Sequence, residues 1–421
     1  MDLQNKKNNI NIIEDNSKDN NGINWKVNLA VLWLAVILCA SSYTMCVPFL
    51  PVFLWKEMGL SRDEVGLWTG LTFATTFFWS AVMAPCWGAL ADKVGQKRMA
   101  LRAGIGLGLT YFLTAISQNV YQLFVVRTLT GMVAGFVPAC MSLASQTLPE
   151  HRMGWGMGIM QSALFSGTIV GPLLGGYLSS WFGMRMTFYL AGTWLITGAV
   201  LIFFFVKDLP FAKEKHKLSF SALFDFKDAF KEKEIFYIMG MIFAMQSVVM
   251  LVQPLITMYV GELRGVMDDD TIKQSGWIFS LAGLAGIIAA TFWGKRGQNY
   301  GYIKIFSLAV FCAGFTNLFQ MFIQNVWQFA LIQFIYGLFL AGGTPNVNAY
   351  ASTVTDKQMR GRVFGLMAAA NQFGGVAGPL AGSLLGSFMP TKYVLVTAGV
   401  ILICVASYSY ISRVKNENST T

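Results

Sequence analysis

Long apolar stretches recur along this chain, and they constrain its fold more than any other feature of the sequence. A helix needs about 20 mostly apolar residues to cross a hydrocarbon core of about 30 Å, and each stretch is about that long. Hydrophobic residues make up 55% of the 421 residues and charged residues only 12%, which is more apolar surface than a soluble core of this size can bury. The sequence therefore predicts an all-α membrane protein.

Twelve stretches form two groups of six, at 29–54, 66–90, 99–117, 121–145, 156–180 and 187–206, and at 235–260, 276–293, 303–323, 327–350, 363–387 and 390–411. The polar segment between them holds seven lysines and six acidic residues, and we expect a cytosolic linker there, with a helix on the lipid surface as the alternative. The predicted domains are a disordered cytosolic tail (1–24), an N-terminal six-helix bundle (25–206), the linker (207–234), a C-terminal six-helix bundle (235–411) and a cytosolic tail (412–421).

Basic residues are distributed unevenly between the two sides that this helix order creates. If both termini lie in the cytosol, most of the 31 Lys and Arg residues fall on the cytosolic side. Arg127 lies within a helix, and the outward loops contain only Lys56, Arg62, Arg185, Arg264, Lys273 and Lys392. The positive-inside rule favours this orientation. It also accounts for the net charge of +10 without a nucleic-acid partner.

The two halves resemble each other at a nearly constant offset. At an offset of 206 residues the matching pairs are Trp87 and Trp293, Gly88 and Gly294, Gly95 and Gly301, Arg98 and Lys304, Gln118 and Gln324, Asn119 and Asn325, Gln122 and Gln328, and Gly131 and Gly337. After one inserted residue the matches include Gly154 and Gly361, Gly167 and Gly374, Gly171 and Gly378, and Pro172 and Pro379. These pairs indicate a tandem duplication of a six-helix unit, an arrangement typical of transporters.

Residues suited to catalysis or metal binding are not clustered. The six cysteines lie in apolar stretches without a CxxC pair, and both histidines, His151 and His216, lie in polar connections. We therefore expect buried thiols, no disulfide, no metal site and no cofactor. An enzyme is disfavoured.

The turn after the second stretch carries a dense motif, Gly88-Ala-Leu-Ala-Asp92-Lys93-Val-Gly95-Gln-Lys97-Arg98. It resembles the signature loop of the major facilitator superfamily, G-x-L-a-D-r-x-G-r-k, except that Gln96 replaces a basic residue. Gly88 allows close helix contact, Gly95 allows the turn, and Asp92 can meet a cation or a helix N-terminus, so we expect a latch for one conformation. A generic basic loop is the alternative. The second half has Gln298 in place of Asp92, so the latch should be one-sided.

Arg127 is the only charged residue deep within an apolar stretch, where an uncompensated charge costs at least about 2.5–3.5 kcal/mol. The segment 123–131 resembles the helix-four motif of proton-driven members of the superfamily, which implies a role for Arg127 in energy coupling. Thr130 and Val133 depart from that motif. The alternative is an arginine that snorkels to the outer interface near Tyr121.

The fifth stretch combines small residues at spacings of four with an internal proline, in the order Gly167-x-x-x-Gly171-Pro172-x-x-Gly175-Gly176. Small residues allow close helix packing, and the proline removes a backbone hydrogen bond and bends the helix. The pattern resembles the complete antiporter motif of drug and metabolite exporters, and the second half contains a weaker copy at 374–382. Ordinary glycine-rich packing is the alternative.

The resemblance covers about residues 25–411 and is most like the twelve-helix drug:proton antiporter branch, which includes bacterial multidrug-resistance transporters. It implies two pseudo-symmetric bundles that rock around a central cavity and export small lipophilic compounds across the cell membrane in exchange for protons. Every Asp and Glu lies in a loop, in a tail or at a helix end. The coupling group is therefore left open between Asp92, Arg127 and a rim carboxylate such as Glu57 or Glu262.

Uncharged polar residues within the stretches are candidates for the lining of the substrate cavity, with helix packing as the alternative for each: Tyr43, Gln161, Gln246, Gln253, Gln333, Asn346, Asn348, Asn371 and Gln372. We expect a small-molecule substrate, contact with the lipid bilayer and a monomer. A transporter of one specific metabolite or sugar, importer or exporter, is the alternative function.

Overall fold

The computed structural model describes residues 24–149, 152–207, 233–355 and 360–414, and within these ranges the chain is α-helical without strands. The first half contains α2 (Trp25–Cys46), η1 (Val47–Phe49), α3 (Leu50–Lys56), α4 (Arg62–Val94), α5 (Gln96–Ile116), α6 (Val120–Val133), α7 (Phe136–Thr147), α8 (Met153–Phe182) and α9 (Met184–Phe205). The second half contains α11 (Lys233–Val252), α12 (Leu255–Arg264), α13 (Asp269–Tyr300), α14 (Tyr302–Leu318), η4 (Phe319–Phe322), α15 (Val326–Leu340), α16 (Gly343–Val354), α17 (Arg360–Phe388), α18 (Thr391–Ser409) and the π-helical η5 (Tyr410–Val414). Residues 1–23 of the predicted N-terminal tail, most of the predicted linker and residues 415–421 of the predicted C-terminal tail lie outside the described residues.

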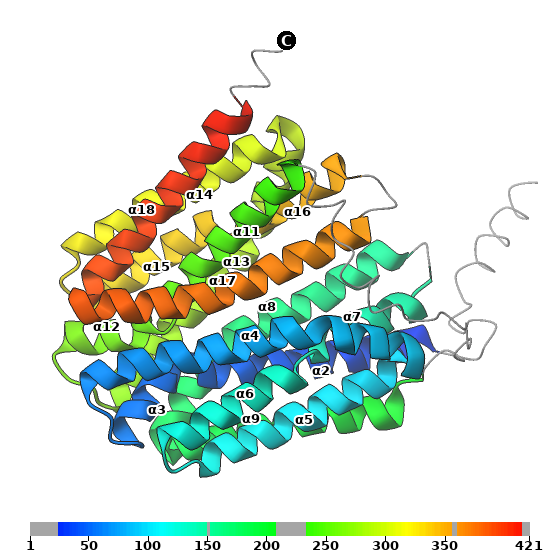
Figure 1. Ribbon diagram of the computed structural model, residues 1–421, viewed down its shortest axis with the longest axis horizontal. Helices are drawn as coiled ribbons and strands as arrows, with labels where there is room; N and C mark the ends of the chain where they lie inside the picture. Colours follow the sequence, from blue (N-terminus) through cyan, green and yellow to red (C-terminus); the bar gives the residue numbers. More distant parts are fainter. Residues whose placement is uncertain (1–23, 150–151, 208–232, 356–359, 415–421) are drawn as a thin grey trace, which may run out of the picture.

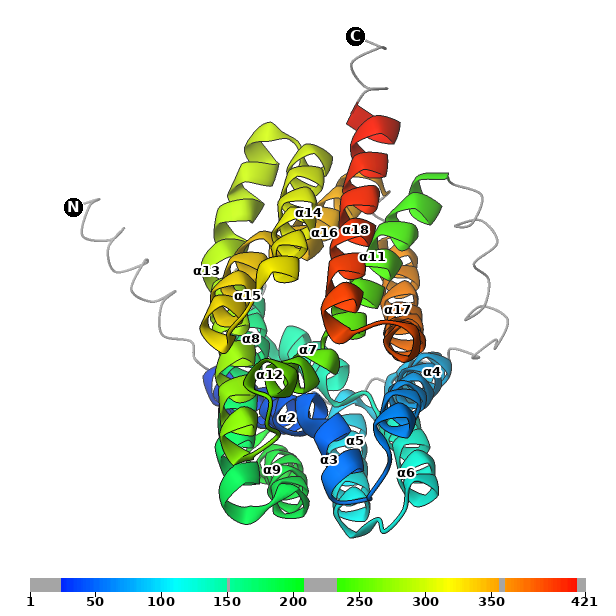
Figure 2. The same cartoon turned by 90° about the vertical axis from the view of Figure 1, so that its left-hand side faces the viewer.

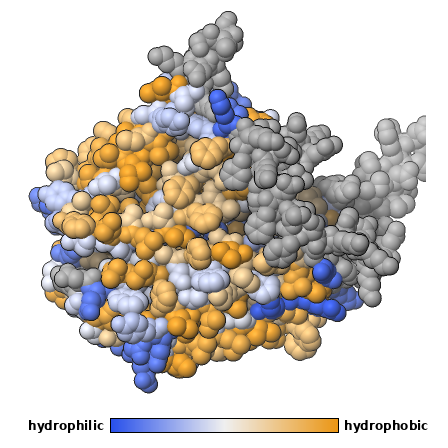
Figure 3. All heavy atoms as spheres, viewed as in Figure 1, coloured by the Kyte–Doolittle hydropathy of each residue, from blue (hydrophilic) through white to orange (hydrophobic). Residues whose placement is uncertain are grey.

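Eleven helical segments of the described chain are long and apolar enough to cross a membrane. The twelfth expected span is α17, whose 29 residues would extend about 43 Å as a helix. It is less apolar because it contains several glycines together with Asn371 and Gln372. Apolar side chains cover much of the visible face of the molecule (Figure 3), as expected for a protein whose solvent is lipid.

Four of the spans are interrupted, and the interruptions occupy equivalent places in the two halves. The first span breaks at η1 and the seventh at Gln253–Pro254, next to prolines that cannot donate a backbone hydrogen bond. The fourth breaks between α6 and α7 at Gly135, whose φ of +120° suits only glycine, and the tenth breaks between α15 and α16. The pseudo-symmetry that the repeats predict therefore extends to the irregular backbone.

Each half has its own apolar core, one from Trp25 to Val206 with Ile272, the other from Ile235 to Ala406. Inside each half a glycine-rich helix packs closely on the first helix of that half. An added Cβ at Gly167, Gly171 or Gly175 of α8 would meet α2 at less than 3.0 Å, and the same holds for Gly374 of α17 against α11.

The two halves meet through two helix pairs, α8 with α13 and α4 with α17. Figure 1 shows the first-half helices running almost horizontally and the second-half helices rising to the right, so that the halves are close at the left and separate toward the right. Figure 2 looks at the left-hand side, where α3 and α12 lie at the front. We call this the closed end, and the opposite end, which carries residues 88–98, the basic end.

Glycines on the facing helices show the same divergence. Near the closed end a Cβ on Gly276 of α13 would lie 2.5 Å from the Pro172 carbonyl oxygen of α8, and Gly375 of α17 packs against Phe77 of α4. Further along the same helix faces, near the basic end, a Cβ would meet no described atom within 4 Å at Gly88, Gly158, Gly294 or Gly365. The halves therefore touch from the closed end to about mid-membrane and part beyond it.

Candidate functional site

Hydrogen bonds reinforce the contact between the halves near the closed end. The Thr257 hydroxyl donates to the Pro48 carbonyl oxygen (2.9 Å), where the seventh span meets the break in the first. The Ser280 hydroxyl donates to the Ile169 carbonyl oxygen (2.6 Å) between α13 and α8. Two further bonds join α17 to α4, from Gln372 to Ser80 and from Ser383 to the Gly66 carbonyl. These hydrogen bonds join the two halves directly along the closed contact.

Charged groups gather at the rim of the closed end. Lys56 pairs with Asp269 across the halves at 3.8 Å, and Glu57 pairs with Arg185 within the first half at 3.2 Å. Arg185 also donates to the Ala115 and Ser117 carbonyl oxygens, both at 2.8 Å, at the end of α5. Because Lys56 and Asp269 are substantially exposed, their pair contributes only about 0–1 kcal/mol. The buried helix contacts dominate the closure.

The signature loop at the basic end has the turn that its sequence predicts, since Gly95 has φ +94° between α4 and α5. Lys97 donates to the carbonyl oxygens of Phe203 (2.9 Å) and Val206 (2.6 Å) and thereby caps the end of α9, where a cation is favourable. Lys93 and Arg98 are exposed. The side chain of Asp92 lies outside the described part of the chain, so its place in the latch stays a prediction.

The close contact expected at Gly88 is not made in this structure. A Cβ there would meet no described atom within 4 Å, because α4 and α17 have separated at this level. In this structure Lys97 of the loop instead contacts α9 of its own half.

Arg127 lies inside the first half with 4% of its surface exposed, so it does not snorkel to the interface. Its guanidinium carbon lies 5.6 Å from the Phe188 ring centre and 5.9 Å from that of Tyr111. Its Nε and Nη2 atoms are buried without a hydrogen-bond partner among the described residues. Cation–π contacts offset part of the burial cost, but they do not replace a counter-ion.

An aromatic column connects Arg127 with the closed end. Phe188 packs edge-on against Phe53 with ring centres 5.1 Å apart, and the guanidinium carbon of Arg185 lies 5.5 Å from the Phe53 ring centre. Arg127 and the Arg185–Glu57 pair are thus joined through two rings in edge-on contact.

The antiporter motif of α8 serves two contacts. Gly167, Gly171 and Gly175 face α2, and the Thr44 hydroxyl, which donates to the Gly167 carbonyl at 2.8 Å, occupies the space beside Gly171. Gly176 faces α13 of the other half instead, with the Ile272 carbonyl oxygen 3.1 Å from a built Cβ. The helix continues through Pro172, so one rigid element connects α2 with the opposite half.

The candidate cavity residues do not form one group. Asn371 donates to Gln246 (3.3 Å) within the second half, and Gln372 contacts the first half. Gln161 and Asn348 are exposed, and Tyr43 and Gln253 are partly buried. Gln333 is buried at 1% exposure.

Asn346 is a correction to the expected lining, because it has no exposed surface. It donates to the Gly342 carbonyl oxygen (2.7 Å) and satisfies the backbone at the break between α15 and α16.

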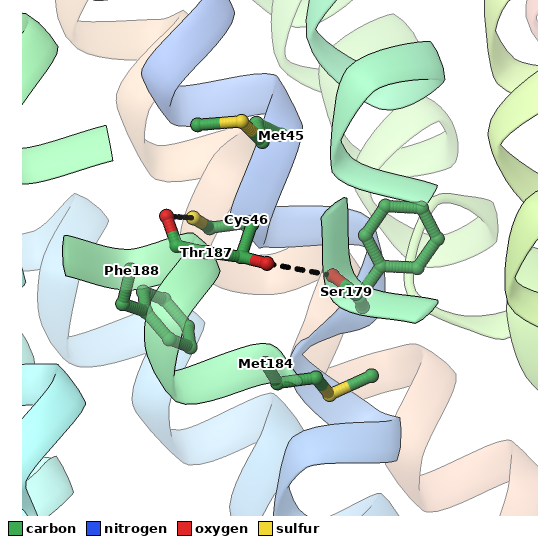
Figure 4. A pocket seen from close by; sticks show the side chains of 7 residues that line it. Met45, Cys46, Ser179, Met184, Thr187 and Phe188 are labelled. Carbon is green, nitrogen blue, oxygen red and sulfur yellow. Dashed lines mark hydrogen bonds between the residues drawn. The ribbon is translucent and has the colours of Figure 1, made fainter. Parts of the chain in front are cut away.

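Two small pockets lie near the closed end. Figure 4 shows the first, about 10 Å³, lined by Met45, Cys46, Phe49, Ser179, Met184, Thr187 and Phe188, with Ser179 and Thr187 hydrogen-bonded at 3.2 Å. The second, about 180 Å³, lies beside Lys56, Glu57 and Asp269. The first has room for about one water molecule, and drug-sized ligands occupy about 300–1,000 Å³. Both pockets are smaller than the usual site of a drug-sized ligand.

Sequence reasoning did not single out Arg102. The structure places it within α5, with its guanidinium carbon 3.7 Å from the Trp87 ring centre. Its position inside the apolar stretch 99–117 was the available signal.

Comparison with known proteins decides the family. The family model described as Major Facilitator Superfamily matches residues 32–271 and 265–420, which together include both six-helix halves. The chain belongs to the major facilitator superfamily. Since this is a family of transporters, the protein is a multi-pass membrane transporter and not an enzyme.

Relatives in this superfamily match over most of their length. The chain is 32% identical over 384 residues to the multidrug resistance protein MdtG of Salmonella heidelberg (strain SL476), covering 90% of this chain and 94% of that protein. The same protein of Salmonella typhimurium gives the same figures.

Solved structures share the fold. The nucleoside transporter NupG superposes with a TM-score of 0.77 at 14% identity, covering 91% of this chain and 99% of that chain. The human organic anion transporter MFSD10 superposes with a TM-score of 0.70 at 16% identity, with the same two coverages.

Proposed function

We propose that this member of the superfamily exports small lipophilic compounds, drugs among them, across the cell membrane by alternating access, in exchange for protons. The multidrug resistance proteins to which it is 32% identical support the drug-export part of this proposal. The complete antiporter motif from Gly167 to Gly176 supports exchange.

One observation carries the alternating-access part. The same faces of α4, α8, α13 and α17 touch near the closed end and separate toward the basic end. That is the geometry of a single access state, and its opposite state requires the halves to rotate about their contact. With both termini in the cytosol, as the charge distribution predicts, the basic end opens toward the cytosol, where an exporter loads its substrate.

For proton coupling we propose Arg127 as a conformational element: its guanidinium stays protonated, so the exchanged proton itself binds at Asp92 or at a rim carboxylate such as Glu57 or Glu262. Among the described residues, acidic side chains lie only at helix ends and in connections, so no membrane-embedded carboxylate competes for the proton. Arg127 has buried N–H groups without partners, and the aromatic column connects it to the closed end. These rings therefore link the charge of Arg127 to the contacts at the closed end, which must break when the protein changes its access state. We propose a monomer in the bilayer that works without a cofactor.

The test is dye uptake into inside-out membrane vesicles. We expect Hoechst 33342 to accumulate in the vesicles when a proton gradient is imposed. This accumulation should stop when the gradient is collapsed. Arg127→Ala at matched expression should abolish gradient-driven accumulation, whereas Arg296→Ala, which removes an exposed arginine of α13, should leave it intact. Uptake that ignores the gradient contradicts antiport, and full activity of Arg127→Ala removes this residue from the mechanism.

A further inference from the structure

The break in the fourth span exposes backbone carbonyl groups that a continuous helix would use. The last carbonyls of α6 lack partners one turn ahead, because Gly135 with φ +120° redirects the chain before α7 begins. Two side chains from other helices meet these carbonyls. Trp87 of α4 donates from Nε1 to the Met132 oxygen (2.7 Å), and Arg102 of α5 donates from Nη2 to the Ala134 oxygen (3.1 Å).

Arg102 is held in more ways than a simple cap requires. Its guanidinium lies flat enough over Trp87 for a 3.7 Å approach to the ring centre, and its Nη2 is 3.4 Å from the place of a Cβ on Gly135. Its Nε and Nη1 atoms are buried without partners among the described residues. Arginine can stack on a ring and donate a hydrogen bond at the same time because its cation is planar, whereas lysine does both poorly.

The second half provides an internal control for the role of this arginine. Trp293, the repeat partner of Trp87, donates to the Leu338 oxygen at 2.8 Å, which reproduces the tryptophan contact. The position equivalent to Arg102 is Leu308, and the break between α15 and α16 is satisfied by Asn346 instead. A broken span of this kind is therefore built without a cation, so folding alone does not explain Arg102.

What distinguishes the first half is its signature loop and its buried arginine. Trp87 directly precedes Gly88, where the loop motif begins, and Arg102 follows Arg98 by one helical turn. The helix that Arg102 caps carries Arg127 seven residues from the break, about 10 Å along the axis. Arg102 and Trp87 are thus a direct mechanical connection between the loop and the helix of Arg127.

We propose that Arg102 is a positioning residue that transmits movement of the signature loop to α6, and so couples engagement of the loop to the change of access state. This role rests on the proposed transport function. When the loop engages the other half, α4 shifts, and the stacked Trp87–Arg102 pair shifts the Ala134 end of α6 with it. Without the guanidinium, loop and helix move independently.

The experiment compares Arg102→Leu, which installs the second-half residue, with Arg102→Lys and with Arg296→Leu. Arg296 is a matched control because it also lies over a ring, Phe292 at 5.0 Å, but is exposed and donates no hydrogen bond to a helix end among the described residues. Each purified variant is reconstituted into proteoliposomes, and Hoechst 33342 transport is measured over a range of dye concentrations. Spin labels on Phe204 and Ile411, exposed at the basic ends of the two halves, report the distance between the halves independently of dye.

We expect Arg102→Leu to lower the maximal transport rate about tenfold, the effect of losing one charge-assisted contact in a moving step, with little change in half-saturating dye concentration. Arg102→Lys should recover part of that rate, and Arg296→Leu should match the unaltered protein. The label distances of Arg102→Leu should respond less to a change of pH than those of the unaltered protein.

Unchanged rates and unchanged distance responses in Arg102→Leu would overturn the role. If that variant does not fold, Arg102→Lys decides: a wild-type rate contradicts the need for a stacked guanidinium. An unaltered protein that neither transports dye nor changes its distances would instead contradict the proposed function itself.

Discussion

Gly276 offers the sharpest test of how the halves close. It lies on α13 where that helix crosses α8, and a Cβ at this position would lie 2.5 Å from the Pro172 carbonyl oxygen and 3.4 Å from the Gly176 Cα. Both atoms belong to backbone, so neither can rotate away. Gly276→Val therefore forces the helices apart at the closed end. Neither core has to change, because the contact lies between the halves.

The size of the effect follows from the cost of overpacking, about 1–3 kcal/mol. Only the state in which α8 and α13 touch bears this cost, so the ratio of the two access states should change by about 5- to 150-fold. Spin labels on Gln118 and Gln324, repeat partners that are both exposed at the closed end, measure the ratio as short and long distances. We expect Gly276→Val to move the distribution to longer distances.

Gly286→Val is the matched control, because it makes the same change on the same helix at a position where a Cβ meets no described atom within 4 Å. It should leave the distances unchanged. Equal distributions for the two variants would refute the inference that this glycine contact holds the closed end together.

Three further predictions concern single groups. Asp269→Asn removes the partner of Lys56 at the rim and should change the same distance ratio by less than about fivefold, since exposed pairs contribute about 0–1 kcal/mol; a larger change would show that the rim pair dominates. Gly171→Val places a side chain where the Thr44 hydroxyl lies and should lower the melting temperature clearly more than Gly158→Val, measured in detergent. Although desolvation raises the pKa of Asp268, hydrogen bonds from Thr271 and from Arg264 lower it to about 2. Because the pKa of Asp268 is lower in the folded protein, its carboxylate stabilises the fold at pH values above the pKa of the unfolded chain, and this stabilisation is lost as the pH falls through about 2. Asp268→Asn should therefore destabilise the protein equally at pH 5 and pH 7.5. A destabilisation that is smaller at one of these two pH values would contradict this.

Much of the fold could be predicted from the sequence because its signals are local. Apolar length marks the spans, and the glycine spacing in the fifth span marks the face that packs on α2. The repeat also held at the level of single contacts, since Trp87 and Trp293 bond carbonyls at equivalent positions. The superfamily followed from the same motifs.

The parts that escaped prediction depend on neighbours that are distant in sequence. Asn346 was a reasonable cavity candidate by composition, but the break before α16 turns it inward to the Gly342 carbonyl. Arg102 was not singled out, because its contacts depend on Trp87 and on the broken end of α6. A close helix contact was also predicted at Gly88, but there a built Cβ meets no described atom within 4 Å, because the separation of α4 from α17 at this level depends on how the halves are arranged.

The central claim is that the two ends of the molecule open in alternation. Double electron–electron resonance on two labelled proteins, one with Gln118 and Gln324 and the other with Phe204 and Ile411, tests it most directly. On a change of pH, with dye present, we expect the first distance to lengthen as the second shortens, by matching population changes. Distances that change together, or a closed end that never opens, would contradict the account.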